Sequence, residues 1–471
     1  MPTTQRTPFS FIKGDKVGSE TDYRDALPVN MTAVARAILG VQGYMLQYPG
    51  LTLHAEGEGI DRGGVWDSRR NAHYRVSGDK LIQVLDSGST IELGTVPGED
   101  TAEFAYSFNN LAVLASGRLY MYNPTDGFRR ITDTDLGNPI DICWIDGFFF
   151  MTDGESLFHT TIADETQIEA IDFDVSQFSP DGTLGVEKTV DNRVIVFNRY
   201  STEYFVNDGS DAFAFIRQGN RSLKLGIVGT HAKTEVDGFF YGLGSRKSES
   251  VSVWIMANNA QKIATREIEK IIGEYTDIEL RDVVLENYEE DGYSFLLVHL
   301  PNETLLYNIT LGSQLGPLAG WTILKSDVAG DLEYRGKFGV KDENLGKWVF
   351  GDKQNSNIGI LDNTVATQYD NIAEWLLFSE FLPLEGQSID RMELQTIPGF
   401  TGSNDSSIAV SITTNGVYYG REKFTMYGDA NEYNRRFIKR RLGYVREYIG
   451  FKFRGATRSR MAIATGFIDH G

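Results

Sequence analysis

Residues 146–161 read Asp146-Gly147-Phe148-Phe149-Phe150-Met151-Thr152-Asp153-Gly154-Glu155-Ser156-Leu157-Phe158-His159-Thr160-Thr161. An Asp-Gly pair opens a run of large apolar residues, a second Asp-Gly pair closes that run, and apolar and polar residues then alternate. Asp-Gly supplies the positive φ angles of a tight two-residue turn, and aromatic residues suit the pleated surface of a buried strand. This pattern predicts a β-hairpin.

The same unit recurs, with variations, along most of the chain. Its seven occurrences begin at Asn71, Asn110, Asp146, Asp191, Asp237, Asp291 and Gly346. A spacing of roughly 35 to 55 residues, with about four strands per repeat, is typical of a β-propeller, in which neighbouring sheets bury one another's faces around an axis. We therefore expect an all-β fold with a β-propeller over residues 63–370. We expect this propeller to have seven blades, or six if the first or last repeat unit belongs elsewhere. The alternative fold is a run of antiparallel hairpins in a sandwich.

The segments outside the repeats carry other patterns. Residues 1–62 are predicted to be an N-terminal arm and linker, in which 32–39 could form either a two-turn helix or a strand. Residues 265–273 have isoleucines at i, i+3 and i+4, which predicts a short amphipathic helix between blades. Residues 371–471 lack the repeat and alternate around Asn415-Gly416, which predicts a hairpin in a β-rich, sandwich-like C-terminal platform module.

Composition indicates a packed, strand-rich protein with an acidic body. The 471 residues include 49 Gly, 28 Phe and 22 Tyr but only 12 Pro, and the net charge is −20. The segment from Arg421 to Arg460 departs from this balance, with 12 Lys or Arg and 4 Asp or Glu. An acidic body repels nucleic acid, whereas a basic module can dock onto an acidic partner.

The sequence carries no disulfide or targeting signal. Its single cysteine, Cys143, excludes an intrachain disulfide and argues against a disulfide-built secreted scaffold. The first residues contain no apolar signal segment, and no stretch approaches the roughly 18 apolar residues of a membrane-spanning helix. We expect a soluble protein assembled in a cytoplasm, with no membrane insertion.

No motif for catalysis or metal binding stands out. The six histidines are scattered without metal-ligand spacing, and there is no nucleophile elbow, phosphate-binding loop or cysteine cluster. The pairs Asp133/Asp135 and Asp172/Asp174 could each put two carboxylates on one strand face, as glycoside chemistry or calcium binding requires. Acidic pairs at this spacing are more often turn and edge residues. We therefore expect no enzyme activity, no catalytic or metal-binding residues and no cofactor.

The basic segment supplies the candidate docking residues. They are Arg435, Arg436, Lys439, Arg440, Arg441, Arg446, Lys452 and Arg454. One interpretation is contact with phosphate groups. Docking onto an acidic protein surface, of a neighbouring subunit or of the acidic body, is favoured because the rest of the chain is strongly acidic. A merely solvated basic face is the third interpretation.

Short stretches that follow one another along nearly the whole chain resemble the sequences of a known protein family. They are Leu27-Pro28-Val29-Asn30-Met31, Ser222-Leu223, Gly229-Thr230, Ile268-Glu269-Lys270-Ile271-Ile272, Val298-His299-Leu300-Pro301, Tyr334-Arg335-Gly336, Gly351-Asp352-Lys353, Gln368-Tyr369-Asp370, Gly420-Arg421-Glu422 and Ile449-Gly450-Phe451-Lys452. Their order and the chain length resemble the tail-hub proteins of short-tailed lambdoid phages (podoviruses), also called packaged-DNA stabilisation proteins or tail accessory factors. The N-terminal arm and the loops of 160–220 match least.

The resemblance implies a structural virion protein and not an enzyme. Such a protein forms a homo-hexameric tail hub beneath the portal and its adaptor, extends the DNA channel, retains the packaged genome, and carries tailspikes and a tail needle. DNA passes through without specific binding, and the protein is assembled in the bacterial host cytoplasm into the virion tail. Two other functions stay open: a glycan-binding or glycan-cleaving propeller, and a nucleic-acid scaffold.

Overall fold

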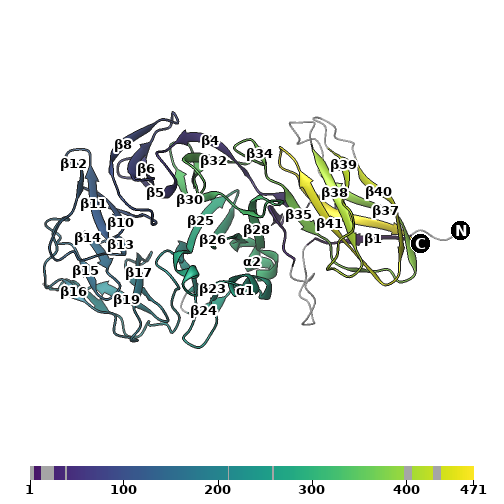
Figure 1. The fold of residues 1–471 in the computed structure, drawn as a ribbon. Helices are drawn as coiled ribbons and strands as arrows, with labels where there is room; N and C mark the ends of the chain where they lie inside the picture. Colours follow the sequence, from purple (N-terminus) through teal and green to yellow (C-terminus); the bar gives the residue numbers. More distant parts are fainter. Residues whose placement is uncertain are drawn as a thin grey trace.

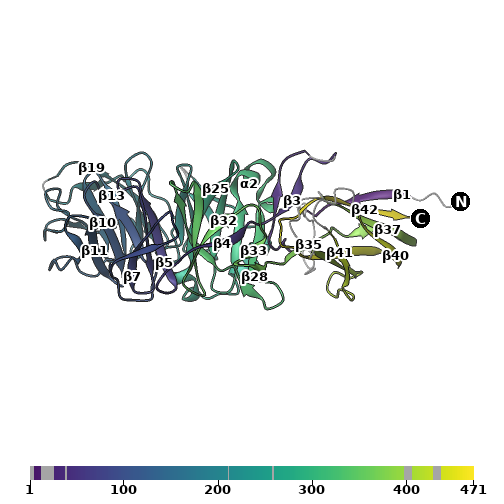
Figure 2. The same ribbon diagram turned by 90° about the horizontal axis from the view of Figure 1, so that it is seen from above.

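The computed structural model describes residues 5–11, 26–37, 40–210, 212–256, 259–396, 406–427 and 436–471. A ring of β-sheets forms one end of an elongated molecule, and a smaller β-sandwich forms the other end (Figures 1 and 2). Seven sheets of four to six strands make up the ring. The expected all-β fold, a seven-bladed propeller with a C-terminal sandwich, is confirmed.

The first six blades follow the chain in order, each formed by antiparallel strands. Blade 1 has β5 (Asp61–Asp67), β6 (Ala72–Ser77), β7 (Lys80–Val84) and β8 (Thr90–Thr95). Blade 2 has β9 (Glu103–Tyr106), β10 (Leu111–Ala115), β11 (Arg118–Asn123) and β12 (Gly127–Arg130). Blade 3 has β13 (Asp141–Ile145), β14 (Phe148–Thr152), β15 (Leu157–His159) and β16 (Phe173–Asp174). Blade 4 has β17 (Thr183–Lys188), β18 (Val194–Asn198), β19 (Thr202–Asn207) and β20 (Phe215–Arg217).

The remaining blades are more varied. Blade 5 has β21 (Lys233–Val236), β22 (Phe239–Gly244), β23 (Ser252–Met256) and β24 (Ala260–Lys262). Blade 6 has β25 (Val284–Glu290), β26 (Tyr293–His299), β27 (Thr304–Asn308), β28 (Trp321–Asp327) and β29 (Leu332–Glu333). Blade 7 starts with β30 (Gly336–Asp342), β31 (Lys347–Asp352) and β32 (Asn357–Asp362). The α-helices of the described residues are α1 (Arg266–Ile272), which follows the expected amphipathic pattern, and α2 (Ile309–Leu315), and short 3-10 helices span Glu279–Asp282 and Pro317–Ala319.

Each repeat seen in the sequence corresponds to the second and third strands of one blade. In the unit that begins at Asp146, Asp146 has φ 52° and Gly147 has φ 95°. The Asp237-Gly238 and Asp291-Gly292 pairs also have positive φ at both residues. Two consecutive positive φ angles define the type I′ turn, whose twist matches that of the flanking strands. The glycine-rich hairpin signal is therefore explained by the turn between the first two strands of a blade.

The ring is closed by a strand from the N-terminal segment. β4 (Gly50–Glu56) pairs antiparallel with β32 and lies between β32 and the short β33 (Thr367–Gln368), which is followed by β34 (Asn371–Ile372). Blade 7 therefore combines residues about 300 positions apart, and Leu51 of β4 is fully buried in it. This corrects the expected arm and linker over residues 1–62, because β4 belongs to the propeller.

A buried polar network joins blade 1 to blade 7 beside this closing strand. Arg75 on β6 donates from Nε to Asp61 Oδ2 at 2.7 Å and from Nη2 to Asp61 Oδ1 at 2.8 Å. The same Nη2 donates to the carbonyl of Phe338 on β30 at 2.8 Å. A Cβ on Gly351 of β31 would lie 2.2 Å from the Asp61 carboxyl carbon, so only glycine fits against this pair. The guanidinium thus links the first and last blades of the ring.

His73 lies next to Arg75 and is held in its neutral form. Its Nδ1 is 3.2 Å from Asp342 Oδ2, and Arg75 Nη1 donates to its Nε2, also at 3.2 Å. A nitrogen that accepts from a guanidinium cannot itself carry a proton. Burial, with a further contribution from the Arg75 charge, lowers the pKa of His73 to about 4.

We expect His73 to contribute a loss of stability as the pH falls from about 6.5 to about 4. In this window His73 becomes protonated in the unfolded chain and stays neutral in the folded chain. This group therefore lowers the free energy of unfolding by up to about 1.4 kcal/mol per pH unit as the pH falls. Urea unfolding at pH 7 and pH 4.5 measures the change. Because burial also lowers the pKa of His299 to about 4, His73→Asn should reduce the slope over this window without removing it, and an equal slope in wild type and variant would contradict the assignment.

The sandwich takes strands from both ends of the chain. One sheet has β2 (Met31–Val34), β3 (Tyr44–Gln47), β42 (Ala462–His470), β37 (Gln387–Thr396) and β40 (Phe437–Val445), with β1 (Gln5–Phe9) also paired to β42. The other has β35 (Trp375–Phe378), β41 (Tyr448–Ala456), β38 (Ser407–Thr413) and β39 (Lys423–Met426), with β36 (Leu382–Pro383) paired to β41. Of the residues 32–39, for which a helix or a strand was considered, 32–34 belong to strand β2, 35–37 are in neither a helix nor a strand, and 38–39 lie outside the described residues. The Asn415-Gly416 turn opens a loop, and not the second strand of a tight hairpin, since β39 begins only at Lys423.

Residues 29 and 30 join the two modules. Val29 forms a parallel bridge with Ile323 of β28 and an antiparallel bridge with Leu376 of β35. The buried Asn30 side chain donates to the carbonyls of Lys325 (2.8 Å) and Glu374 (2.6 Å). Propeller and sandwich therefore share a continuous hydrogen-bonded backbone at this point, which restricts movement between them.

Candidate docking surface

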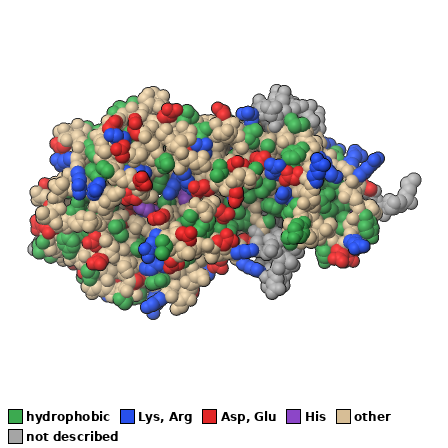
Figure 3. Space-filling view, viewed as in Figure 1, with side chains coloured by type: hydrophobic (Ala, Val, Ile, Leu, Met, Phe, Trp, Pro, Cys, Tyr) green, Lys and Arg blue, Asp and Glu red, His purple; other side chains and the backbone are tan. Residues whose placement is uncertain are grey.

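Seven of the eight basic candidate residues lie in the sandwich and differ in their surroundings. Arg435 lies outside the described residues. Lys439, Arg440 and Arg441 are on β40, Arg436 immediately precedes it and Arg446 is in the turn after it, and Lys452 and Arg454 are on β41. In Figure 3 the sandwich end of the molecule carries blue side chains beside green apolar ones. The structure thus brings seven candidates into one module without placing them in one cluster.

Three of the seven are neutralised within the sandwich. Arg436 donates from Nε and Nη2 to the two oxygens of Glu393, both at 2.6 Å. Arg454 donates to Glu374 at 2.8 Å and to Glu422 at 2.6 Å, and Lys452 lies 3.4 Å from Glu422. The adjacent arginines lower the pKa of Glu393. The pKa of Glu422 is also lowered, because the hydrogen bond from Arg454 and the charges of Arg454 and Lys452 outweigh the opposing effect of burial. These cations serve the fold, and little of their charge is left for a partner.

The remaining cations are better placed for a partner. Lys439 Nζ contacts Thr425 Oγ1 on β39 and so links the edge strands of the two sheets. Arg440, Arg441 and Arg446 are exposed, and no carboxylate of the described residues forms an ion pair with them. β40 is the last strand of its sheet, and Arg441 has φ 57° where its pairing with β37 shifts register. A bulged edge strand presents its side chains to solvent.

Exposed apolar residues that were not predicted from the sequence lie near these arginines. Tyr418 is 78% exposed, Tyr444 66% and Tyr448 45%. Their closeness to turns could have indicated exposure. Each tyrosine lies within two residues of a turn residue (Gly416, Arg446 or Glu447) and not inside a buried run. Tyrosine and arginine are among the residue types that contribute most to the binding energy of protein interfaces.

The propeller carries the opposite charge. Residues 50–373 hold 27 Lys or Arg and 50 Asp or Glu, a net charge of −23, whereas residues 374–471 hold 13 and 11, a net charge of +2. Around the axis, Lys233 on β21 lies 2.9 Å from Asp141 and 4.0 Å from Glu187, which come from the first strands of blades 3 and 4. Burial, together with the nearby Asp141 and Glu103 carboxylates, raises the pKa of Glu187 to about 7 against the attraction of Lys233. One lysine among several carboxylates leaves this region acidic.

The two aspartate pairs considered for glycan or calcium chemistry support turns. Asp133 Oδ1 accepts from the backbone N–H of Asp135 at 2.8 Å in the loop after β12. Asp174 Oδ1 accepts from the N–H of Val175 at 2.8 Å, and Asp172 is buried. Within the described ranges, no group of three or more His, Cys, Asp or Glu side chains is arranged to hold a metal ion. The carboxylates therefore act as acceptors for local backbone groups.

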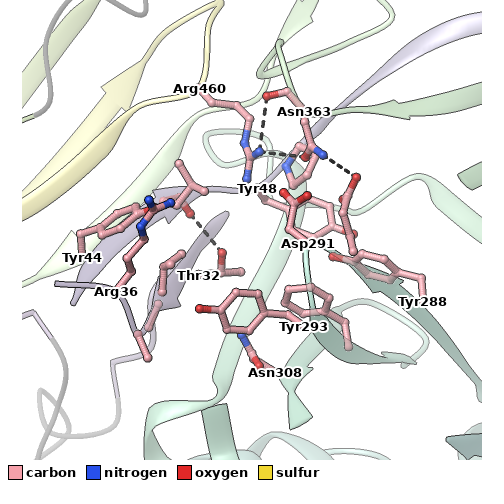
Figure 4. A pocket seen from close by; sticks show the side chains of 17 residues that line it. Thr32, Arg36, Tyr44, Tyr48, Tyr288, Asp291, Tyr293, Asn308, Asn363 and Arg460 are labelled. Carbon is pink, nitrogen blue, oxygen red and sulfur yellow. Dashed lines mark hydrogen bonds between the residues drawn. The ribbon is translucent and has the colours of Figure 1, made fainter. Parts of the chain in front are cut away.

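A hollow of about 590 Å³ lies where the β2–β3 hairpin faces blade 6 (Figure 4). Arg460 closes one side, donating to Asn363 Oδ1 at 2.8 Å and to the carbonyl of Gln47 at 2.6 Å. Tyr44, Tyr48, Tyr288 and Tyr293 supply most of the aromatic lining. The lining residues, all of them described, include no His, Cys, Ser or Lys, and the hydroxyl of Thr32 donates to the carbonyl of Leu46 at 3.2 Å. The hollow is a feature of the junction between the two modules.

Comparison with known proteins identifies matches to both modules. The family model described as "Bacteriophage P22 Gp10, beta-propeller" matches residues 5–366, and the one described as "Bacteriophage P22 Gp10, beta-sandwich" matches residues 374–471. The "Tail hub protein gp10" of Salmonella phage P22 is 31% identical over 462 residues, which cover 94% of this chain and 94% of that protein. The resemblance inferred from separated short stretches is confirmed.

Solved structures show weaker similarity. The N-terminal domain of Nup159 has a TM-score of 0.39 at 10% identity, covering 74% of this chain and 99% of that one. The Pan2 WD40 domain of Neurospora crassa has a TM-score of 0.43 at 8% identity, covering 69% of this chain and 97% of that one. Neither similarity bears on what the chain does. No helix in the described ranges is long and apolar enough to cross a membrane.

Proposed function

The chain belongs to the bacteriophage P22 Gp10 family of phage tail hub and stabilisation proteins, a structural family, and from this we propose that it forms a homo-hexameric hub in the tail of a short-tailed phage. The hub sits beneath the portal and its adaptor, extends the DNA channel, and carries tailspikes and a tail needle. It is assembled in the bacterial host cytoplasm and retains the packaged genome without chemistry of its own. The observation that carries the proposal is the 31% identity across 94% of both chains, which spans both modules.

Two physical features support a role as a rigid part beside DNA. The hydrogen-bonded junction at Val29 and Asn30 couples the propeller to the sandwich. The propeller, at a net −23, repels a phosphate backbone. A passage for DNA needs this property, because each contact between a cation and a phosphate adds to salt-sensitive attachment.

The proposal is tested in phage particles that carry an epitope-tagged copy of the chain. We expect immunogold label at the tail vertex, and mass measurement of isolated tails that contain six copies. In particles made without the chain, heads should fill with DNA and then release it, which a nuclease-protection assay measures. Particles that lack the chain and still protect their genome, or label confined to the head shell, would overturn the proposal.

A further inference from the structure

The hollow between the β2–β3 hairpin and blade 6 has the size and the walls of a binding pocket. Its volume of about 590 Å³ lies within the range of about 300–1,000 Å³ that is usual for small-molecule sites. The hairpin side carries Arg36 and Tyr44, and the blade 6 side carries Asp291 and Tyr293 (Figure 4). Arg36 and Asp291 are exposed and both tyrosines are half-buried, so a ligand reaches these walls directly from solvent.

Part of the lining is fixed by hydrogen bonds within the chain. Asn308 Oδ1 accepts from the backbone N–H of Leu311 at 2.9 Å. Asn363 accepts from Arg460 at 2.8 Å through Oδ1 and donates through Nδ2 to Glu290. These contacts tie the strands around the hollow together and give it a defined shape.

Other lining groups are free to bind a ligand. Within the described ranges, Arg36 and Asp291 form no ion pair, and the hydroxyls of Tyr44 and Tyr293 form no hydrogen bond. Tyr48 is 4% exposed, and its hydroxyl has no hydrogen-bond partner either. A buried hydroxyl without a partner is uncommon, because its desolvation is costly. A ligand that brings a hydrogen-bonding group to Tyr48 recovers that cost.

The charge of the lining favours a neutral ligand. Its two cations, Arg36 and Arg460, are balanced by two carboxylates, Glu290 and Asp291. A phosphate or a polyamine would meet two like charges together with the two opposite ones, so the hollow selects neither of them.

A pyranose ring matches the free groups. The C–H groups on its faces pack on aromatic rings, which Tyr44 and Tyr293 supply from the two walls. Its hydroxyls both donate and accept, so they can bond to guanidinium, carboxylate and phenol groups at once. A peptide backbone instead offers one donor and one acceptor per residue along a line, which suits a strand edge better than a compact hollow.

We propose that the hollow binds one pyranose unit of a neutral saccharide. Tyr44 and Tyr293 contact the faces of the ring. Arg36 and Asp291 bond to its outer hydroxyls, and Tyr48 bonds to the innermost one. The proposal goes beyond the hub, because it assigns a ligand to the junction between propeller and sandwich, and it does not depend on the number of copies in the tail.

Ligand-observed NMR on the full-length chain tests the site. The probes are the methyl pyranosides of glucose, galactose, mannose, rhamnose and N-acetylglucosamine, together with a disaccharide of each sugar. We expect saturation transfer to at least one methyl pyranoside, with a Kd of about 1 mM, as is typical of so small and polar a ligand. A disaccharide that binds at least tenfold more tightly identifies a saccharide chain as the ligand, and equal affinities identify a single sugar.

Substitutions locate the binding in the hollow. Tyr44→Ala removes a ring on which the sugar packs and should weaken binding at least tenfold. Tyr48→Phe keeps the ring and removes only the hydroxyl, so it should weaken binding roughly fivefold and leave the urea midpoint unchanged or higher. Tyr418→Ala, at a 78% exposed tyrosine of the sandwich, is the matched control and should bind like wild type.

Three outcomes overturn the proposal. One is the absence of saturation transfer to every probe at about 50 mM. Another is binding that Tyr44→Ala and Tyr48→Phe leave at the wild-type affinity, because the sugar then lies elsewhere. The third uses the tripeptide alanyl-tyrosyl-alanine as a further probe: if it binds and no glycoside does, the hollow is a peptide site. None of these results bears on tail location or genome retention, which the particle experiment tests separately.

Discussion

Replacing Leu51 by aspartate is expected to abolish closure of the propeller. Leu51 is fully buried in β4, opposite Leu361 of β32, and packs in a cluster with Tyr48, Phe350 and Leu361. An unpaired carboxylate at this position costs on the order of 4 kcal/mol, a large part of the stability of a typical domain. We expect blade 7 to separate from β4, with a lower urea midpoint and new proteolytic cleavage between residues 48 and 62.

The same strand offers a matched control. Leu53 is two residues further along β4 and 53% exposed, and it pairs through its backbone with Gly359 of β32. Leu53→Asp makes the same chemical change at the surface, where the effect should stay within about 0.5 kcal/mol. If both variants melt alike, β4 does not close the ring through its buried face.

Hairpin chemistry explains why the propeller could be predicted from sequence. Asp-Gly turns and aromatic runs are local signals, and each records the second and third strands of a blade without reference to the rest of the chain. The strand β4 carries no such signal. Its assignment depends on pairing with β32, about 300 residues away, and a one-dimensional pattern does not encode which distant strand completes a sheet. The N-terminal boundary was wrong for that reason.

The surroundings of the basic candidate residues could be predicted only in part, for a related reason. Charge and residue type are visible in the sequence, so the basic segment could be found. Whether an arginine is neutralised depends on its neighbours in space. Arg436 faces Glu393 across a pair of strands, whereas Arg446 stands in an exposed turn, and nothing in their immediate sequence distinguishes them. Exposed tyrosines were overlooked because apolar residues in an alternating segment are ordinarily assigned to the core.

Replacing Arg75 by methionine is expected to destabilise the junction of blades 1 and 7 by about 3–5 kcal/mol. Arg75 is completely buried, and its removal leaves the Asp61 carboxylate and the Phe338 carbonyl without their guanidinium donor. Burial already raises the pKa of Asp61, and Arg75 is the main group that opposes this rise. The variant should therefore melt at a lower temperature, with the loss smaller at low pH where Asp61 can take up a proton.

A double replacement separates the lost ion pair from lost packing. In Asp61→Asn with Arg75→Met, no charge of the pair is left buried, so the double variant should be more stable than Arg75→Met alone, although it has one more substitution. Exposed Arg129→Ala serves as the control and should change the free energy of unfolding by less than about 0.5 kcal/mol. If the two substitutions simply add, the cost comes from packing and the pair does not act as a unit. If adding Asp61→Asn instead increases the free energy of unfolding, the unpaired Asp61 carboxylate is the source of the lost stability. The Asp61–Arg75 pair is then required for joining the first blade to the last.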